Sequence, residues 1–335
     1  MRIAVVGAGG PAGLNVCRSL SEAGYEVVGL DSNEWHLEWA KDWCAETILC
    51  DGLTVELVNG LGVEMIHSQP EQPLYWLAAH REQIWPITNM PAQQVIALCQ
   101  DKFEAGLALR RAKLRTDRVL EVADALDLLR VADALGFPYW LRARRGAGAR
   151  GAILAADHDQ AYHWLCYWRA RDPEMEFIAE EYLPGRDLAW SSLWHKGELV
   201  TSFVRERLEY IYPQLSPAGL TGTPTVARVI HDDFVNFIAE ETVLAVDTQA
   251  QGFYSVDLKE DENGTPRPTE INAGRCFTTS YFSTAAGLNM MDLWVRAGLG
   301  QSLPEVPRTN ALEDGLLWIR HIDAPARLVP APVPA

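Results

Sequence analysis

Two acidic residues, Asp257 and Glu270, lie on either side of a predicted β-turn and could hold a cation between them. Asn263-Gly264 is typical of a two-residue type I′ turn, so the flanking segments are expected to form a hairpin. With these two residues as the loop, residue 262 faces 265, and counting back along both strands places Asp257 opposite Glu270. Pro266 and Pro268, which have no N–H, then fall where no ladder hydrogen bond is lost.

Facing carboxylates need compensation, because like charges about 4.5 Å apart across a sheet destabilise it. The predicted register places Ser255, Lys259 and Asn272 on the same polar face as this pair. Oxygen ligands of this kind suit Mg²⁺ carrying nucleotide phosphates, with Mn²⁺ as an alternative. The competing interpretation is a surface hairpin whose carboxylates are solvated or paired with Lys259.

A second candidate site is the loop of residues 142–151, which holds four arginines and three glycines: Arg142, Arg144, Arg145, Arg150, Gly146, Gly148 and Gly151. Glycine-rich backbone can fold over phosphate oxygens, and guanidinium groups supply charge and paired donors. The loop is therefore predicted to cover a nucleotide triphosphate. A solvated basic turn and an RNA-contacting loop are the alternatives.

The net charge disfavours the RNA alternative. The 335 residues carry a formal charge of −16, which repels a phosphate backbone over most of the surface. We therefore expect no nucleic-acid or membrane partner. The six cysteines show no CxxC spacing, and no apolar run approaches the ~18 residues of a membrane span. The expected location is a reduced cytoplasm.

The elements that position these residues begin with a βαβ pattern. Residues 3–6 and 26–30 read as buried strands, with a helix over about 12–23 between them. The turn Gly7-Ala8-Gly9-Gly10-Pro11-Ala12 fits a dinucleotide-binding fingerprint, and Asp31 ends the second strand as a candidate ribose ligand. The competing interpretation is a tight turn that binds no dinucleotide.

The remaining chain reads as strands and helices of a different kind. Alternating elements up to about residue 98 predict a parallel, doubly wound α/β sheet. Residues 101–135 have a helical pattern, and apolar strand-like runs at 139–141, 151–155, 177–182 and 188–194 suggest an α+β module. The last residues, 324–335, hold four prolines and are expected to form an extended or mobile tail.

These residues together resemble the ATP-grasp superfamily, in its single-module, carbamoyl-phosphate-synthetase-like branch. The resemblance covers nearly the whole chain and is carried, in order, by Asp101-Lys102-Phe103, residues 137–151, the segment Glu180-Glu181-Tyr182-Leu183-Pro184-Gly185-Arg186-Asp187, Asp257, and Glu270-Ile271-Asn272. It implies a Rossmann-like module over 1–98 that usually binds no NAD. An ATP-grasp domain of two α+β subdomains over 99–323 would follow, its lid at about 136–182.

The resemblance also implies a set of nucleotide contacts. These are Lys102, Arg142, Arg144, Gly146, Gly148, Glu180, Glu181, Tyr182, Leu183 and Asp187. Lys102 and Arg142 match the two basic positions that contact the phosphates. The hinge that recognises adenine through its backbone matches Glu181 and Leu183, and Asp187 lies where an acidic residue binds ribose.

Asp257, Glu270 and Asn272 match the magnesium ligands of the family. Where the family commonly has Asn-Pro-Arg, this chain has Asn272-Ala273-Gly274-Arg275. Arg275 comes one position late, so its contact with the transferred phosphoryl group is the least supported part of the match. Together with Lys102 and Arg142 it completes the predicted catalytic set.

The implied activity is an ATP-dependent carboxylate–amine ligase. A substrate carboxylate would attack the γ-phosphoryl group, and an amine would capture the acyl phosphate to form an amide. Both substrates are small molecules that the sequence does not name, and a homodimer is compatible with this interpretation. Arg205, Arg207 or Arg228 could bind the substrate carboxylate, and His67 could touch substrate or be a hydrogen-bonded loop residue.

Two other classes of function stay open at this point. An NAD(P)-dependent oxidoreductase would use the Gly7 turn and Asp31. A nucleotide-binding regulator without catalysis would account for the altered stretch before Arg275. Most tryptophans, including Trp35 and Trp39 at helical spacing, are expected in the core rather than in a ligand pocket.

Overall fold

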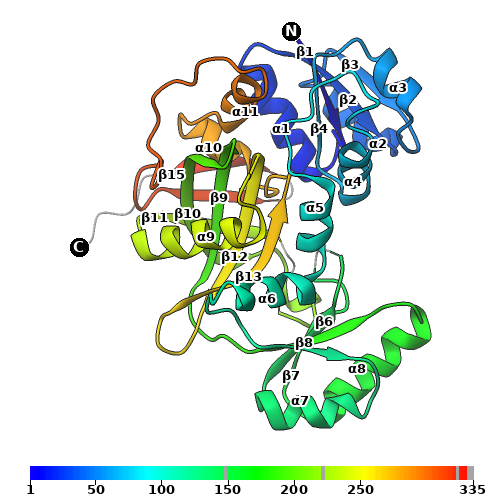
Figure 1. Ribbon diagram of the computed structural model, residues 1–335, viewed down its shortest axis with the longest axis vertical. Helices are drawn as coiled ribbons and strands as arrows, with labels where there is room; N and C mark the ends of the chain where they lie inside the picture. The colour runs from blue at the N-terminus through cyan, green and yellow to red at the C-terminus, as the bar shows by residue number, and fades with distance from the viewer. Residues whose placement is uncertain (147–148, 220–222, 322–323, 330–335) are drawn as a thin grey trace.

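The computed structural model describes residues 1–146, 149–219, 223–321 and 324–329, the last range as backbone alone. Gly148 of the predicted nucleotide loop and residues 330–335 of the predicted tail lie outside the described residues. The chain forms three β-sheets with helices packed against them (Figure 1). The sheet built from residues 119–181 forms the lower lobe in this view.

The N-terminal sheet is parallel and has the strand order β3-β2-β1-β4. Its strands read as continuous apolar runs because helices shield the sheet, and Ile3, Val5, Val28 and Leu30 are fully buried. The prediction of a βαβ unit is confirmed. The elements are β1 (Arg2–Val6), α1 (Pro11–Glu22), β2 (Glu26–Asp31), α2 (Glu34–Ala40), β3 (Glu46–Leu49), α3 (Val55–Gly60), β4 (Met65–Ser68) and α4 (Glu71–Ala79).

The lower lobe is an antiparallel sheet of order β5-β8-β6-β7. Its core contains Tyr139, Leu141 and Phe177 beneath two helices. The elements are β5 (Val119–Val122), α7 (Asp127–Leu135), β6 (Tyr139–Ala143), β7 (Ile153–Ala155), α8 (His158–Arg171) and β8 (Phe177–Glu181). The sheet includes β5, in a stretch for which the sequence predicts only helix and which precedes the expected lid boundary at 136.

The largest sheet is antiparallel, with the order β13-β12-β9-β10-β11-β14-β15. Its strands are β9 (Asp187–His195), β10 (Glu198–Tyr210), β11 (Pro224–Ile230), β12 (Gly252–Glu260), β13 (Pro266–Ala273), β14 (Leu317–His321) and β15 (Ala324–Val329). The helices around it are α5 (Gln93–Gln100), α6 (Lys102–Arg111), the 3-10 helix η1 (Pro213–Leu215), α9 (Asp233–Val246), α10 (Tyr281–Ala285) and α11 (Met290–Gly298). Residues 324–329, where the sequence predicts an extended or mobile tail, are extended and pair with β14 at the sheet edge.

Alternate residues of this sheet supply two different cores. On one face, Trp190 and Val256 pack with residues of α9. On the other face, Phe203 and Phe253 join one continuous core with Ile3 of the N-terminal sheet. The N-terminal module and the large sheet are thus joined by shared apolar packing.

The hairpin of β12 and β13 has the predicted facing pair but a different turn. Asp257 pairs with Glu270, as the sequence predicts. The loop is one residue longer, however, because Asp261 N–H donates to the Thr265 carbonyl at 3.0 Å and Gly264 adopts φ +74°. A bulge at Thr269 compensates, since Leu258 pairs with Pro268 while Asp257 pairs with Glu270.

The prediction that Trp35 and Trp39 lie in the core is wrong. They are 71% and 67% exposed on α2, although their spacing is helical. The buried residues of this helix are Leu37 and Ala40 instead.

Across the described ranges, none of the helices has the length and apolar character that a membrane span needs.

Candidate active site

The strand pairing places Glu270, Asp257, Ala189 and Arg205 in one row across β13, β12, β9 and β10. Asn272 lies two residues beyond Glu270, and its Nδ2 donates to Asp257 Oδ2 at 3.4 Å. The three residues predicted as metal ligands therefore lie together at one end of the sheet. Val256 and Ile271, which point to the opposite face of the same two strands, are buried in the core.

Arg207 compensates part of this negative charge. Its guanidinium forms an ion pair with Asp257 and a second one with Asp187 at 3.2 Å. Asp187 also accepts a hydrogen bond from the Tyr210 hydroxyl. Burial would lower the pKa of Arg207, but Asp257 and Asp187 raise it above its usual value. The carboxylate predicted to bind ribose is thus held by two partners within the protein.

Lys102 and Arg142 lie on the other side of Glu270. The distance from Glu270 Oε2 is 3.9 Å to Lys102 Nζ and 3.5 Å to Arg142 Nη1. Arg142 also pairs with the buried Glu180 through both of its oxygens, with Nη2 at 2.7 Å from Oε1. Lys102 Nζ donates to the Gly146 carbonyl at 2.7 Å. These contacts join the lower lobe to the large sheet through charged groups.

The pKa values of the facing pair differ because their cations differ. Burial raises the pKa of Asp257 to about 6, with the Glu270 charge adding to the rise and Arg207 opposing it. Burial would also raise the pKa of Glu270, but Lys102 and Arg142 hold it below its usual value. Glu270 is therefore ionised at neutral pH, and the Asp257 side is the one short of positive charge.

The residues present fit a hard divalent cation. The donors are two carboxylates on neighbouring strands and an amide, all oxygen-bearing groups of the kind that Mg²⁺ binds. No cluster of three His, Cys, Asp or Glu side chains suited to a metal occurs in the part of the chain described. The raised pKa of Asp257 shows a buried carboxylate that a nearby cation would stabilise.

Arg275 reaches this group despite its shifted position in the sequence. Its Nη2 donates to Asn272 Oδ1 at 2.7 Å and to Glu71 Oε1 at 2.6 Å. Gly274 makes the approach possible, because it adopts φ +83°, which disfavours other residues. Arg275, Lys102, Glu270 and Asn272 line one small cavity.

Arg144 and Arg145 of the predicted nucleotide loop are paired with acids outside this cavity. Arg144 Nε lies 2.8 and 2.9 Å from the two oxygens of the buried Asp101, and its Nη1 is 2.7 Å from Glu121. Arg145 pairs with Asp101 and Glu176. Of the predicted loop contacts, the Gly146 backbone reaches Lys102, whereas the Arg144 side chain is held elsewhere.

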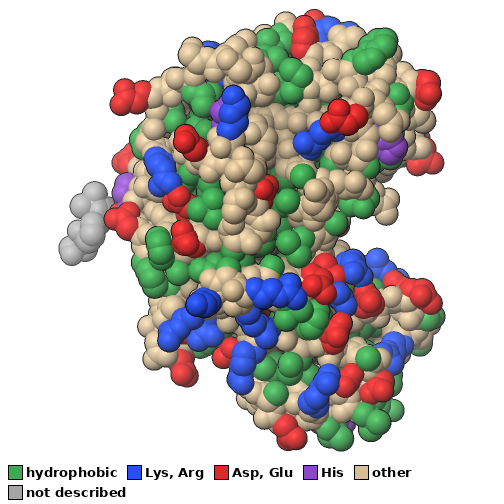
Figure 2. All heavy atoms as spheres, viewed as in Figure 1, with side chains coloured by type: hydrophobic (Ala, Val, Ile, Leu, Met, Phe, Trp, Pro, Cys, Tyr) green, Lys and Arg blue, Asp and Glu red, His purple; other side chains and the backbone are tan. Residues whose placement is uncertain are grey.

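The predicted adenine hinge follows β8. Glu181 lies 3.6 Å from Arg118 and from Arg267, Leu183 is buried, and Tyr182 is 37% exposed. Figure 2 shows that the molecule is hollowed beside this junction, between the lower lobe and the rest, and that acidic and basic side chains gather on the lobe. The hinge residues thus lie where the two antiparallel sheets approach each other.

Asp117 is a site residue that the sequence reasoning missed. Its side chain is buried beside Glu180 and accepts a hydrogen bond from Thr116 Oγ1 at 2.9 Å. Burial, with the Glu180 charge, raises its pKa to about 7, while Arg142 opposes the rise. Its only sequence signal is an acid between a helical run and an apolar run, which is common in surface turns.

The glycine turn after β1 leaves little for a dinucleotide to bind. The N–H groups of Gly7 and Ala8 donate to Leu30 O, and Gly10 N–H donates to Gly7 O. Gly9 N–H donates to Asp31 Oδ2 at 3.1 Å, so the proposed ribose ligand serves the turn itself. These internal bonds favour the interpretation of a tight turn that binds no dinucleotide.

A cleft of about 980 Å³ lies beside this turn and extends to Arg275. Asp31, Asp51, Glu71 and Trp76 are among its lining residues. His67 is buried nearby rather than in the cleft lining, with its ring against Phe253 and Trp294 and its Nε2 2.9 Å from Gln69 Nε2. Burial lowers its pKa to about 4, so it is a neutral packing residue.

The chain is similar in sequence and in fold to several known proteins. No protein-family sequence profile matches the chain. The carbamoyl phosphate synthase large chain of Clostridium perfringens is 22% identical over 213 residues, 63% of this chain. The chain spans about a fifth of the length of that relative, since the match covers 20% of it.

Solved structures match nearly the whole chain. N5-carboxyaminoimidazole synthetase of Staphylococcus aureus, in complex with ADP, covers 95% of this chain and 81% of its own, with a TM-score of 0.74 and 21% identity. The biotin carboxylase domain of Hydrogenobacter thermophilus 2-oxoglutarate carboxylase, with MgADP and bicarbonate, covers 95% and 73%, with a TM-score of 0.73 and 16% identity. The L-amino acid ligase of Bacillus licheniformis covers 95% and 80%, with a TM-score of 0.73 and 14% identity.

The chain therefore has the fold of the ATP-grasp superfamily. The predicted resemblance and the predicted α/β fold class are confirmed.

Proposed function

We propose that this protein is an ATP-dependent, ADP-forming ligase that joins a small carboxylate to an amine. The observation that carries the proposal is the convergence of Lys102, Arg142, Glu270, Asp257 and Asn272 where the lobe meets the large sheet. Phosphoryl transfer requires mainly positioning and charge neutralisation, and this cluster offers both cations and cation ligands. The ADP and MgADP complexes of the structural neighbours support ATP as the phosphoryl donor.

Each residue of the cluster has a role in this proposal. Lys102 and Arg142 bind phosphate oxygens, exchanging their contacts with Glu270 for the nucleotide. Asp257, Glu270 and Asn272 would hold Mg²⁺, which when bound neutralises phosphate charge and orients the transferred group. Arg275, held by Asn272, faces the cavity where the phosphoryl group would move.

In the reaction, a carboxylate oxygen attacks the γ-phosphorus and the bond to ADP breaks. The amine nitrogen then attacks the acyl carbon, phosphate leaves, and the nitrogen loses a proton. The large cleft offers room for the amine beside Arg275, and its carboxylates Asp31, Asp51 and Glu71 suit a cationic molecule. The names of the structural neighbours, which include an L-amino acid ligase, support small-molecule substrates.

The proposal is tested by incubating the protein with ATP, Mg²⁺, pooled carboxylic acids and hydroxylamine. Hydroxylamine captures an acyl phosphate as a hydroxamate, so ADP and hydroxamate should appear together. Lys102→Met should abolish both, whereas Lys41→Met, a change at an exposed lysine paired with Glu38, should not. Absence of ADP and hydroxamate with every acid, together with no binding of ATP, would refute the ligase.

A further inference from the structure

Arg205 is a buried cation for which no carboxylate of the described residues lies within ion-pair distance, although the charge of Asp257 acts on it from farther away. The residue is 3% exposed and projects from β10 on the same face as Phe203. Among the residues that the structure describes, its hydrogen-bond partner is the Thr279 hydroxyl, and its Nε has none. The Phe203 and Phe277 rings flank the guanidinium at 5.8 and 5.4 Å, but ring faces supply no full negative charge.

The other two arginines expected near a substrate carboxylate are already neutralised. Arg207 pairs with Asp187 and Asp257. Arg228 is exposed and pairs with Glu206 at 2.6 Å. A buried charge without a partner is costly, so the unpaired state of Arg205 indicates that a ligand completes it.

A second cation increases the need for an anion here. Arg320, on β14, donates to Pro224 O at 2.9 Å and to Thr278 O at 3.3 Å, and no described carboxylate pairs with it. Burial, together with the charges of Arg207 and Arg320, lowers the pKa of Arg205 to about 9, while the charge of Asp257 opposes this change. The guanidinium is still charged at neutral pH, so the protein keeps a buried positive centre.

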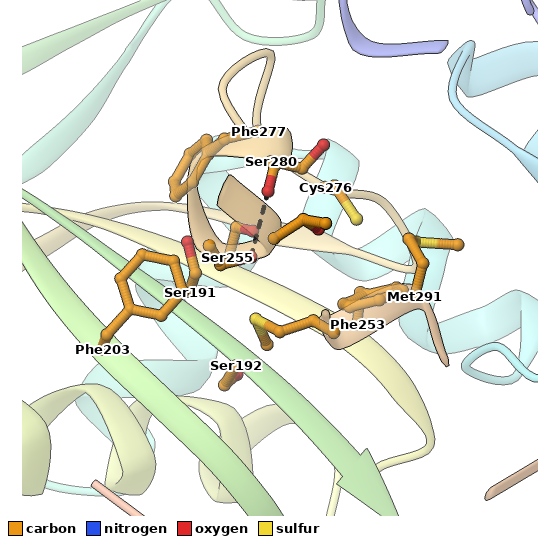
Figure 3. Close-up of a pocket in the computed structure, with 12 residues that line it drawn as sticks. Ser191, Ser192, Phe203, Phe253, Ser255, Cys276, Phe277, Ser280 and Met291 are labelled. Atoms are coloured by element: carbon orange, nitrogen blue, oxygen red, sulfur yellow. Dashed lines mark hydrogen bonds between the residues drawn. The ribbon is translucent and has the colours of Figure 1, made fainter. Parts of the chain in front are cut away.

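A small pocket lies on the far side of the phenylalanine rings that flank this centre (Figure 3). Phe203 and Phe277, which flank Arg205, line one side, and Phe253 and Met291 line the other. The pocket lining also includes Ser255, which precedes Val256 in the sequence, and Cys276, which follows Arg275. Its volume is about 20 Å³, which is room for about one water molecule.

The pocket offers a further polar atom without a partner. Ser280 Oγ is buried there, and no described group bonds to it. Arg205 also lies in the strand row of Glu270 and Asp257, two strands from Asp257, so their Cα atoms are about 10 Å apart. A ligand on Arg205 would therefore lie next to the predicted phosphoryl-transfer site.

We propose that Arg205 binds a carboxylate of the organic-acid substrate, beside the Phe203 and Phe277 rings that flank its guanidinium. The identity of the anion as a substrate rests on the proposed ligase function, whereas the binding site itself does not. A planar carboxylate matches the paired donors of a guanidinium. A phosphate is disfavoured, because its second charge and further oxygens would face the phenylalanine rings.

Binding is tested without ATP, using acetate, propanoate and butanoate as probes in saturation-transfer NMR and thermal unfolding. Butanamide and inorganic phosphate at matched ionic strength control for shape and charge. The variants are Arg205→Met, Arg205→Lys and, as a matched control on the neighbouring strand, Arg228→Met. Circular dichroism and affinity for MgADP verify the fold of each variant.

We expect at least one of the acids to bind the unmodified protein and Arg228→Met, and to raise their Tm by roughly 2 °C when near saturation. Arg205→Met should weaken this affinity at least about tenfold, because it removes a charge-assisted hydrogen bond, and Arg205→Lys should weaken it less. Arg205→Met should also raise the Tm of the free protein, since an unpaired buried charge is removed.

Two results would overturn the inference. One is that no acid of the panel binds the unmodified protein, and the other is that the bound acid binds Arg205→Met equally well. The hydroxamate assay separates this outcome from failure of the proposed function. If ADP release depends on the acid and is unaffected in Arg205→Met, the binding site at Arg205 is refuted and the ligase function is supported. If acid binding is lost in Arg205→Met but the unmodified protein releases no ADP, the binding site is supported and the ligase function is refuted.

Discussion

Replacing Glu270 by glutamine tests whether the facing carboxylates form the metal and phosphate site. The substitution keeps the size of the side chain and removes one of the two charged ligands. It also leaves Lys102 and Arg142, now 3.9 and 3.5 Å from Glu270 Oε2, without that partner. The burial that raises the pKa of Asp257 remains, but the Glu270 charge that adds to the rise is gone, so the pKa of Asp257 should fall.

The size of the effect follows from these contacts. Each of the two ion pairs has a Coulomb attraction of about 4 kcal/mol at an effective dielectric constant of 20. Most of this attraction offsets the desolvation of the charges, so we expect a net loss of about 1–3 kcal/mol in unfolding free energy. Loss of one of two carboxylate ligands should weaken divalent-cation binding at least about tenfold, which corresponds to about 1.4 kcal/mol.

The assay is a titration of Mn²⁺ in the presence of ADP, followed by electron paramagnetic resonance, together with urea unfolding. Glu206→Gln is the matched control, because Glu206 is also partly buried on the large sheet but pairs with Arg228 away from the cluster. We expect weaker cation binding in Glu270→Gln alone. Equal Mn²⁺ affinity in Glu270→Gln and the unmodified protein would refute the assignment of this pair as the metal site.

Three further predictions test the surrounding structure. Arg207→Met removes the cation shared by Asp257 and Asp187. Urea unfolding should show a loss of about 3–5 kcal/mol in unfolding free energy, against less than about 1 kcal/mol for the control Arg228→Met. Similar losses in the two variants would contradict a buried ion triad. Gly9→Ala would place a Cβ 2.0 Å from His36 O, whereas the Cβ of Gly10→Ala would lie 3.5 Å from Gly7 O. Only Gly9→Ala should lower the Tm, because overpacking of this kind costs about 1–3 kcal/mol or more of unfolding free energy. Equal Tm values for the two variants would exclude this close packing. Burial raises the pKa of Asp117 to about 7, so between about pH 4 and pH 7 the folded state keeps a proton that the unfolded state has lost, and stability falls as pH rises. The Tm of Asp117→Asn, relative to that of the unmodified protein, should therefore be higher at pH 8 than at pH 5. A Tm difference that does not change with pH would refute the raised pKa of Asp117.

The sequence predicted the facing of Asp257 and Glu270 better than it predicted the turn between their strands. The facing of Asp257 and Glu270 follows from Asn263-Gly264 and the two prolines, yet the loop is longer than the dipeptide suggests. The bulge at Thr269 restores the predicted pairing. Local rules could not show this, because a bulge depends on the fit of both strands to the rest of the sheet.

Other differences have similar physical causes. Helical spacing of Trp35 and Trp39 indicates a shared face but not whether the protein covers it, and here it does not. Strand β5 lies in a stretch whose Ala, Leu and Arg content favours helix, and pairing with β8 overrides that preference. Charge partners such as Arg207 for Asp257 come from strands far apart in the sequence, so spacing alone could not identify them.

The large sheet is joined to the N-terminal module and to the lower lobe in two different ways, by apolar packing and by ion pairs. The N-terminal module shares one apolar core with the large sheet, so separating them would expose Phe203, Phe253 and Trp294 to water. The lower lobe is covalently tethered by two short segments, at 112–118 and 182–186, and meets the large sheet through ion pairs around Arg142 and Lys102. Phosphate oxygens can replace carboxylates in such pairs, whereas nothing in water replaces an apolar contact. Under the proposed function, a nucleotide would therefore enter by exchanging one set of anions for another at the lobe, while the other two sheets keep their shared apolar core.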